Sequence, residues 1–78
     1  MQHQNQTLKF SLNIPQSKIL RYYEGHVKNL IVTLDNGKRV QLPLINFRPF
    51  ISDEGLQGLF EVTFTSEFKL VSLNRINH

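Results

Sequence analysis

The stretch LIVTLDNGKRVQL, from Leu30 to Leu42, carries the strongest information on the fold. Two segments of alternating side chains flank Asp-Asn-Gly, a pattern typical of a β-hairpin. If the loop held only Asn-Gly, Val32 would share a face with Arg39. A longer loop, Asp-Asn-Gly, places Val32 opposite Val40 and Leu30 opposite Leu42, so that one face becomes apolar. Because a slip of one residue moves every side chain of a strand to the other face, the sequence predicts the longer loop, with Gly37 in a left-handed bulge.

Strands are also predicted on both sides of this hairpin. In TLKFSLNI, residues 7–14, apolar and polar side chains alternate, which indicates a half-buried strand. Phe60, Val62 and Phe64 share one face of a later strand, and Val71 and Leu73 of the strand that follows are predicted to lie opposite them.

The turn between these last two strands is predicted from its composition. Ser-Glu lacks the Gly or Asn that a tight primed turn requires. We therefore predict a longer loop, SEFK, from Ser66 to Lys69.

A short helix is predicted between the first strand and the hairpin, from Gln16 to Glu24. Asn13 or Ser17 is the expected cap, and Gly25 is the expected stop signal. Ile19 and Tyr23 are four positions apart and therefore share a face. A helix of this length is unstable alone, so it is expected to pack on the sheet.

Together these segments predict a mostly β fold with one short α-helix, in the order β-α-β-β-β-β. The expected architecture is a small, partly open antiparallel barrel or a strongly bent five-stranded sheet. Residues 1–6 are predicted to form a flexible polar tail, and residues 7–76 a single small β-rich domain.

Composition narrows the classes of function. The net charge of +3 and the pI near 9.6 weakly favour anionic partners. The chain contains no cysteine, which excludes a disulfide scaffold and a zinc-thiolate site and favours a cytoplasmic location. We find no signal peptide and no apolar stretch of roughly 18 residues, so no membrane association is expected.

No catalytic or metal signature is present in the sequence. His3, His26 and His78 are isolated from one another, so metal ligation is not expected. Asp53 and Glu54 are adjacent in a loop, as in a solvated turn. No nucleophile elbow or phosphate-binding loop accompanies them. The expectation is a protein that is not an enzyme and uses no cofactor.

The segment FRPFISDEGLQGLF, from Phe47 to Phe60, has two interpretations. In the structural one, Phe47 and Phe50 plug the open end of the barrel, and Arg48 donates hydrogen bonds to carbonyls or to Asp53 and Glu54. In the functional one, Arg48 is an exposed anion contact beside a phenylalanine platform. In both, Pro49 is expected to push Arg48 out of helical backbone.

Two glycines follow in the same segment. Gly55 and Gly58 are expected to adopt backbone conformations that other residues resist, where the chain re-enters the sheet.

Two functions follow from these features. The first is a non-enzymatic binding or protein-interaction module, acting on an unknown protein partner or through weak self-association of exposed strand edges. The alternative is a single-stranded nucleic-acid-binding small β-barrel, which would also use Lys28 and whose affinity would fall steeply with salt. The candidate binding surface consists of Arg21, Tyr22, Tyr23, Arg39, Arg48 and Phe50.

Several of these segments also occur together in a known family. LRYYEG, the NG…V.LP hairpin, FRPFISDEGLQGLF and KLVSLNRI make the chain resemble the bacterial family called domain of unknown function 2835, from about Leu8 to Ile76. The family prefers Leu where Phe47 stands here, and a shorter N-terminal tail. The resemblance implies a short, stand-alone bacterial protein and supplies no activity.

Overall fold

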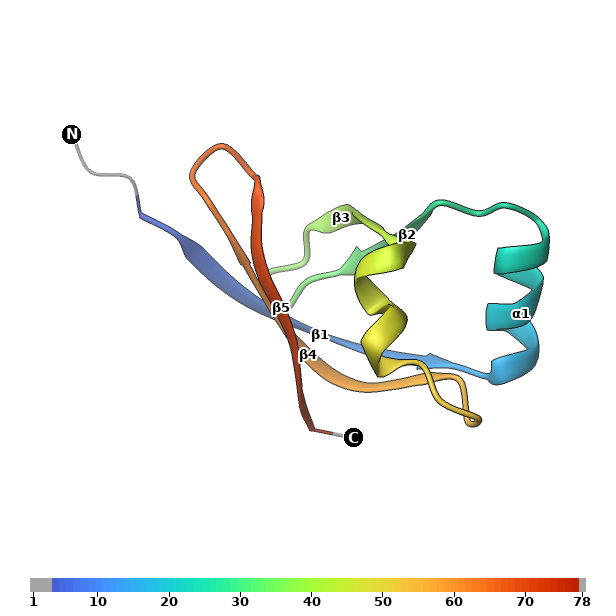
Figure 1. Ribbon diagram of the computed structural model, residues 1–78. Helices are drawn as coiled ribbons and strands as arrows, with labels where there is room; N and C mark the ends of the chain where they lie inside the picture. Colours follow the sequence, from blue (N-terminus) through green and yellow to red (C-terminus); the bar gives the residue numbers. More distant parts are fainter. Residues whose placement is uncertain (1–3, 78) are drawn as a thin grey trace.

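The computed structural model describes residues 4–77 and confirms a mostly β fold with one short α-helix (Figure 1). Gln6, which we assigned to the polar tail, is the first residue of β1. A 3₁₀ helix, η1, was not predicted. The elements are β1 (Gln6–Ile14), α1 (Gln16–Glu24), β2 (Asn29–Thr33), β3 (Arg39–Pro43), η1 (Leu44–Phe50), β4 (Leu56–Phe64) and β5 (Leu70–Asn77).

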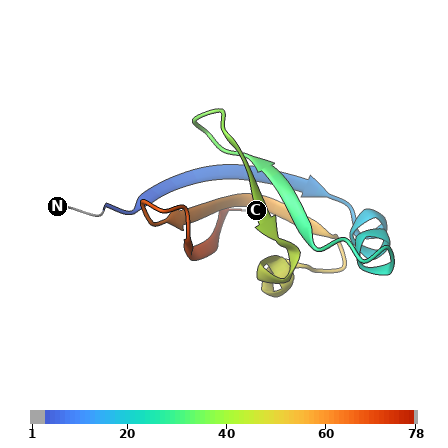
Figure 2. The same cartoon turned by 90° about the horizontal axis from the view of Figure 1, so that it is seen from above.

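The five strands divide into two antiparallel sheets, in the orders β1-β4-β5 and β2-β3, rather than forming one bent sheet. Seen from above, the β2–β3 hairpin crosses over the long strand β1 (Figure 2). The backbone N–H of Asp35 donates to the carbonyl of Lys9 at 2.8 Å, where the two sheets meet. The two sheets therefore cross instead of pairing along their length (Figure 2). No closed barrel is formed within residues 4–77.

The register predicted for the β2–β3 hairpin is confirmed. Val32 lies opposite Val40. The turn is closed by Leu34 N–H donating to Lys38 O at 2.7 Å, and Gly37 has a φ of 87°. Val32 is 2% exposed, so the apolar face that decided the register is indeed the buried one.

The turn of the β4–β5 hairpin differs from its prediction. Thr65 N–H donates to Lys69 O at 2.8 Å, and Phe68 N–H donates to Thr65 O at 2.9 Å. The loop is therefore Ser66–Phe68, one residue shorter than predicted. Phe68 takes the left-handed position, with a φ of 64°.

The prediction for β5, the strand after this turn, is right for one residue and wrong for another. Leu73 lies opposite Val62, as predicted. Val71 does not face the core: it is 51% exposed, because the register shifts between Thr63 and Phe64 and leaves Val71 without a partner on β4.

Phenylalanine rings occupy the centre of the core. The rings of Phe10 and Phe60, on adjacent strands, are stacked 5.5 Å apart, and Phe47 from η1 meets Phe60 edge-on at 5.8 Å. Each such pair contributes about 0.5–1.5 kcal/mol of stability beyond that gained by burying the rings. The buried hydrophobic side chains, which form the core, are Phe10, Ile19, Leu30, Val32, Leu34, Leu42, Leu44, Phe47, Leu56, Phe60, Val62 and Phe64.

The helix η1 follows from a period of three in its sequence, LINFRPF. A 3₁₀ helix has three residues per turn, so positions three apart share a face. Leu44 and Phe47 are buried and Phe50 is half-buried on one face, while Ile45 and Arg48 point outward. Pro49 lies inside η1, so the prediction that it drives Arg48 out of helical backbone is wrong. The three anchored apolar side chains hold the helical turn.

The corner after η1 is tied together by a different arginine from the one expected. Arg48 is exposed, and its guanidinium makes no hydrogen bond or ion pair with residues 4–77. Instead, Arg75 on β5 donates to the carbonyls of Phe50 and Gln57, each at 3.4 Å, and lies 6.0 Å from the Phe50 ring centroid. The structural interpretation of Arg48 is therefore wrong, because Arg75 from β5, and not Arg48, donates to the carbonyls of this corner.

Glycine makes room for this arginine. Gly55 and Gly58 both have positive φ, as predicted. A Cβ atom on Gly58 would lie 2.5 Å from the backbone oxygen of Asn77 and 2.8 Å from Cδ of Arg75, so any other residue there would displace both the β5 backbone and the arginine.

Candidate functional site

A groove lies between α1 and η1, and three backbone hydrogen bonds position its walls. The N–H of Leu44 donates to the carbonyl of Lys28 at 2.7 Å, which sets the start of η1 beside the entry to β2. At the end of α1, Val27 N–H donates to Tyr22 O at 2.8 Å and His26 N–H to Tyr23 O at 3.2 Å. His26 has a φ of 60°, so these bonds form a Schellman-type stop in which histidine takes the left-handed position usually held by glycine.

The helix α1 spans the predicted residues, but its ends and faces differ in detail. It begins after Pro15, with no side-chain cap, so neither Asn13 nor Ser17 has the expected role. Ile19 is buried and Tyr22 is half-buried against the core. Tyr23, which we predicted to share the face of Ile19, is 42% exposed and stands beside the groove.

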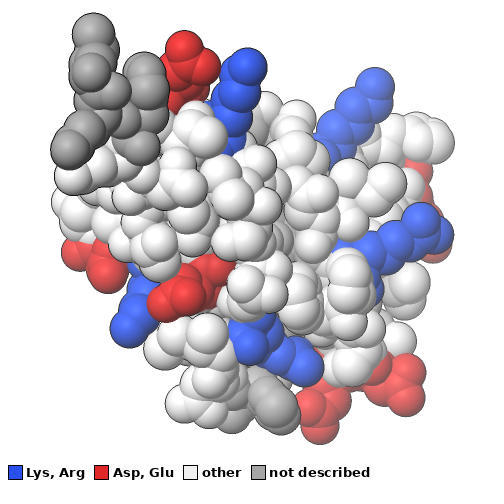
Figure 3. Space-filling model, turned by 60° about the vertical axis from the view of Figure 1, so that its left-hand side comes forward, with Lys and Arg blue, Asp and Glu red and all other residues white. Residues whose placement is uncertain are grey.

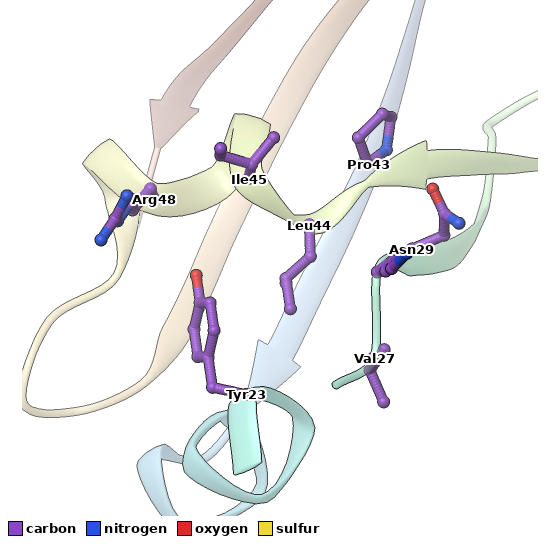
Figure 4. Close-up of a pocket in the computed structure, with 8 residues that line it drawn as sticks. Tyr23, Val27, Asn29, Pro43, Leu44, Ile45 and Arg48 are labelled. Atoms are coloured by element: carbon purple, nitrogen blue, oxygen red, sulfur yellow. The ribbon is translucent and has the colours of Figure 1, made fainter. Parts of the chain in front are cut away.

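The groove has a volume of about 530 Å³ and a largely apolar surface. In Figure 4 the ring of Tyr23 rises from α1 with its hydroxyl towards η1, and Leu44 points into the space between them. Ile45, 65% exposed, lies on the outward face of η1 next to Arg48. The lining residues are Tyr23, Val27, Lys28, Asn29, Pro43, Leu44, Ile45 and Arg48.

Both charged residues of the groove, Lys28 and Arg48, are positive, and the lining contains no Asp or Glu. A smaller hollow of about 310 Å³ adjoins it, lined by Tyr23, Arg48 and Ile51. Arg48 therefore stands between two hollows, with its guanidinium free to meet an anion. An apolar surface edged by two cations suits a ligand that is apolar along its length and carries a carboxylate.

The structure brings together only part of the predicted binding surface. Tyr23, Arg48 and Lys28 line the groove. Arg21 is exposed on α1 outside it, and Tyr22 packs on the core.

The two other predicted residues lie elsewhere. Phe50 is half-buried, with its ring 5.5 Å from that of Phe60. Arg39 lines a second hollow between β3 and the β4–β5 turn.

Sequence reasoning missed the apolar half of the groove. Val27 and Ile45 are 38% and 65% exposed and line the groove, yet neither was predicted to belong to a binding surface. The signal for Ile45 was present: in LINFRPF, the apolar positions three apart mark an inward face and leave Ile45 and Arg48 together on the other.

Two further classes of site were sought in the part of the chain that the structure describes. Residues 4–77 contain no group of three or more His, Cys, Asp or Glu side chains placed to hold a metal ion. His3 and His78 lie outside these residues. In the same range, neither helix has the length and apolar character that crossing a bilayer requires.

Comparison with known proteins identifies a family. Residues 6–76 match the family described as Protein of unknown function (DUF2835). No curated protein and no solved structure matches the chain.

Proposed function

Because the chain belongs to the DUF2835 family, whose description assigns no activity, we propose a function from the geometry of the groove. The protein is a non-enzymatic interaction module. Its α1–η1 groove binds an apolar segment of a partner protein that carries carboxylates.

The observation that carries this proposal is the pairing of exposed apolar side chains with two unpartnered cations. Tyr23, Val27 and Ile45 are exposed around one groove, and Lys28 and Arg48 edge it without an acidic neighbour in the lining. Apolar side chains grouped beside positive ones favour a partner of complementary character.

The size of the groove indicates modest affinity. A volume of about 530 Å³ admits a few side chains of a partner, not a broad interface. Small interfaces of this kind belong to transient complexes. We expect dissociation constants in the micromolar range, which correspond to about 8 kcal/mol of binding free energy.

A binding role is also supported by where the charges lie. Every buried side chain in residues 4–77 is apolar, so the charged groups of the described chain are at least partly in water. Catalysis relies on polar groups held in a site from which water is excluded. The exposed charges here suit recognition better than chemistry.

Single-stranded nucleic acid is less well supported as the ligand. Such proteins combine a positive groove with several stacking aromatic rings. Here Tyr22 is turned to the core, and Arg39 is separated from the groove of Tyr23 and Arg48. On the face shown in Figure 3, the Lys and Arg side chains stand apart, with uncharged or acidic surface between them.

The test is selection of short random peptides displayed on phage against the folded protein. We expect the enriched peptides to combine apolar residues with Asp, Glu or a free C-terminal carboxylate. Synthetic copies should bind in isothermal titration calorimetry. Arg48→Glu should weaken that binding by roughly tenfold, or about 1.4 kcal/mol, or more.

The matched control is Arg21→Glu, which makes the same charge change on an exposed residue of α1 outside the groove. It should leave the affinity nearly unchanged. Enriched peptides without acidic groups, or equal losses in the two variants, contradict the proposal. Binding of an oligothymidylate that falls steeply with salt and is abolished by Arg48→Glu favours the nucleic-acid alternative instead.

A further inference from the structure

The turn of the β4–β5 hairpin holds an aromatic ring outward in a strained conformation. Phe68 has a φ of 64°, and its side chain is 58% exposed. A left-handed conformation is unfavourable for a residue other than glycine. Strain of this kind is concentrated at functional sites, so it calls for a function of the ring.

The ring of Phe68 forms one wall of a second groove, about 470 Å³ in volume. It lies 6.1 Å from the ring of Phe64, and Nζ of Lys38 lies 5.9 Å from its centroid. The opposite wall is β3 and the residue before it. The lining residues are Lys38, Arg39, Val40, Gln41, Phe64 and Phe68.

This wall is the unpaired edge of a strand. Leu34 N–H donates to Lys38 O, and Leu44 N–H to Lys28 O, so the even-numbered residues of β3 are those bonded to β2. The backbone groups of Arg39 and Gln41 therefore face away from β2. Within residues 4–77, β3 has no second neighbouring strand. Four backbone donors and acceptors remain free on the edge that borders the groove.

We propose that this second groove binds an extended peptide of a partner protein, which adds to the edge of β3 as a further strand. Its backbone pairs with Arg39 and Gln41. Main-chain hydrogen bonds of this kind provide affinity, and alternate side chains provide specificity.

The faces of β3 define the peptide's sequence pattern. Val40 is half-buried on the inner face, towards Phe64 and Phe68, while Arg39 and Gln41 are exposed on the outer face. A strand paired with β3 alternates in the same way. Apolar side chains would lie inward against the ring of Phe68, and acidic ones outward beside Arg39.

Charge selects against a second copy of this chain as the occupant. Antiparallel pairing of two β3 edges centred near Arg39 would bring Lys38 and Arg39 of one copy close to the same residues of the other. Like charges directly opposite each other are destabilising in a sheet. An acidic, alternating peptide meets no such repulsion.

The probe for this proposal is a synthetic peptide of alternating Val and Glu, capped at both ends. A Val-Lys peptide of equal length is the control. We expect only the Val-Glu peptide to shift the amide resonances of residues 38–41 and 68 in NMR titrations. In the complex, the amide protons of Arg39 and Gln41 should become protected from exchange with solvent.

Three variants sharpen this test. Gln41→Pro removes one free amide that β2 does not use, and proline is tolerated on such an edge, so the fold should persist while binding weakens roughly tenfold or more. Phe68→Gly should weaken binding without loss of stability. Arg39→Glu should transfer the preference to the Val-Lys peptide.

The two grooves can be told apart by the same measurements. Arg48→Glu, which disables the α1–η1 groove, should leave the affinity for the Val-Glu peptide unchanged. The inference is overturned if neither peptide binds, if both bind equally, or if binding leaves the Arg39 and Gln41 amides exchanging as before. It is also overturned if an oligothymidylate displaces the peptide from this groove, which would assign Phe68 to base stacking.

Discussion

The two hairpin turns share one pattern of backbone hydrogen bonds but place different residues in the left-handed position. In each, the first residue donates to the fifth and the fourth donates to the first: Leu34 with Lys38 and Gly37, and Thr65 with Lys69 and Phe68. Gly37 adopts φ 87° at no steric cost, whereas Phe68 adopts φ 64° against its preference. Only the second turn therefore accepts backbone strain, and the strained residue carries an exposed ring.

The strands that follow these turns, β3 and β5, differ in how much apolar surface they bury. The β2–β3 hairpin buries one face on the core, including Leu30, Val32 and Leu42. In β5, by contrast, Leu70, Val71 and Ile76 are all at least one-third exposed. After the first turn, β3 closes the core, whereas after the second turn β5 carries apolar surface outward.

The largest expected effect tests this contrast in burial. Leu42→Ala should lower the free energy of unfolding by about 2–5 kcal/mol, because a buried leucine leaves a cavity. Val71→Ala should change it by less than about 0.5 kcal/mol, as at other surface positions. Urea unfolding measures both. Similar losses in the two variants would show that β5 is as deeply packed as β3.

The next effect tests what holds the second hairpin to the body. Arg75→Ala should cost about 1–2 kcal/mol, from long hydrogen bonds to two carbonyls and the contact with the Phe50 ring. Arg48→Ala should be neutral to within about 0.5 kcal/mol, since its side chain is exposed. Thermal unfolding of the two variants decides the assignment, and the reverse order would restore Arg48 as the residue that ties the corner.

A smaller effect isolates the backbone of the first turn. A Cβ atom on Gly37 would meet nothing within 4 Å, so Gly37→Ala adds no clash. The left-handed backbone alone should cost about 1 kcal/mol. A neutral result in chemical denaturation would mean that the turn can relax, and the comparison with Phe68 would lose its basis.

The smallest effect isolates the backbone of the second turn. Phe68→Gly relieves the left-handed strain and loses the contact with the Phe64 ring, and these two terms oppose each other. The net change in unfolding free energy should stay within about 0.5 kcal/mol. A loss of several times that size would give Phe68 a structural role and weaken the case for a binding ring.

Local rules predicted one of these turns and missed the other. The loop before Lys38 follows from Asp-Asn-Gly and from the need for a uniform apolar face, both readable in the sequence. The loop Ser66–Phe68 contains no residue that favours positive φ, so its composition could not predict its length or its left-handed position. The bounds of the helix from Gln16 to Glu24 were predicted, but its cap was not, because α1 begins after Pro15 without a side-chain cap.

The candidate sites were less predictable because they depend on which segments meet in space. Arg48 and Arg75 look alike in sequence, and only the course of β5 decides which one reaches the carbonyls of Phe50 and Gln57. The groove beside Tyr23 requires η1. The period of three in LINFRPF is present in the sequence, but we did not use it to predict a helix. The division into two sheets depends on where the β2–β3 hairpin crosses β1, which no local pattern encodes.

The pairing of β1 with β4 has a consequence for synthesis on the ribosome. Phe10 meets Phe60 only after most of the chain has been made, whereas the β2–β3 hairpin can close as soon as its own residues emerge. Hairpins form in about 1–10 μs, and pairings between distant segments are slower. Until β4 appears, the nascent chain presents the apolar side of β1 to its surroundings, including Leu8, Phe10 and Leu12. Unpaired strands with exposed apolar side chains favour aggregation, so pairing with β4 removes a hazard that β1 carries during synthesis.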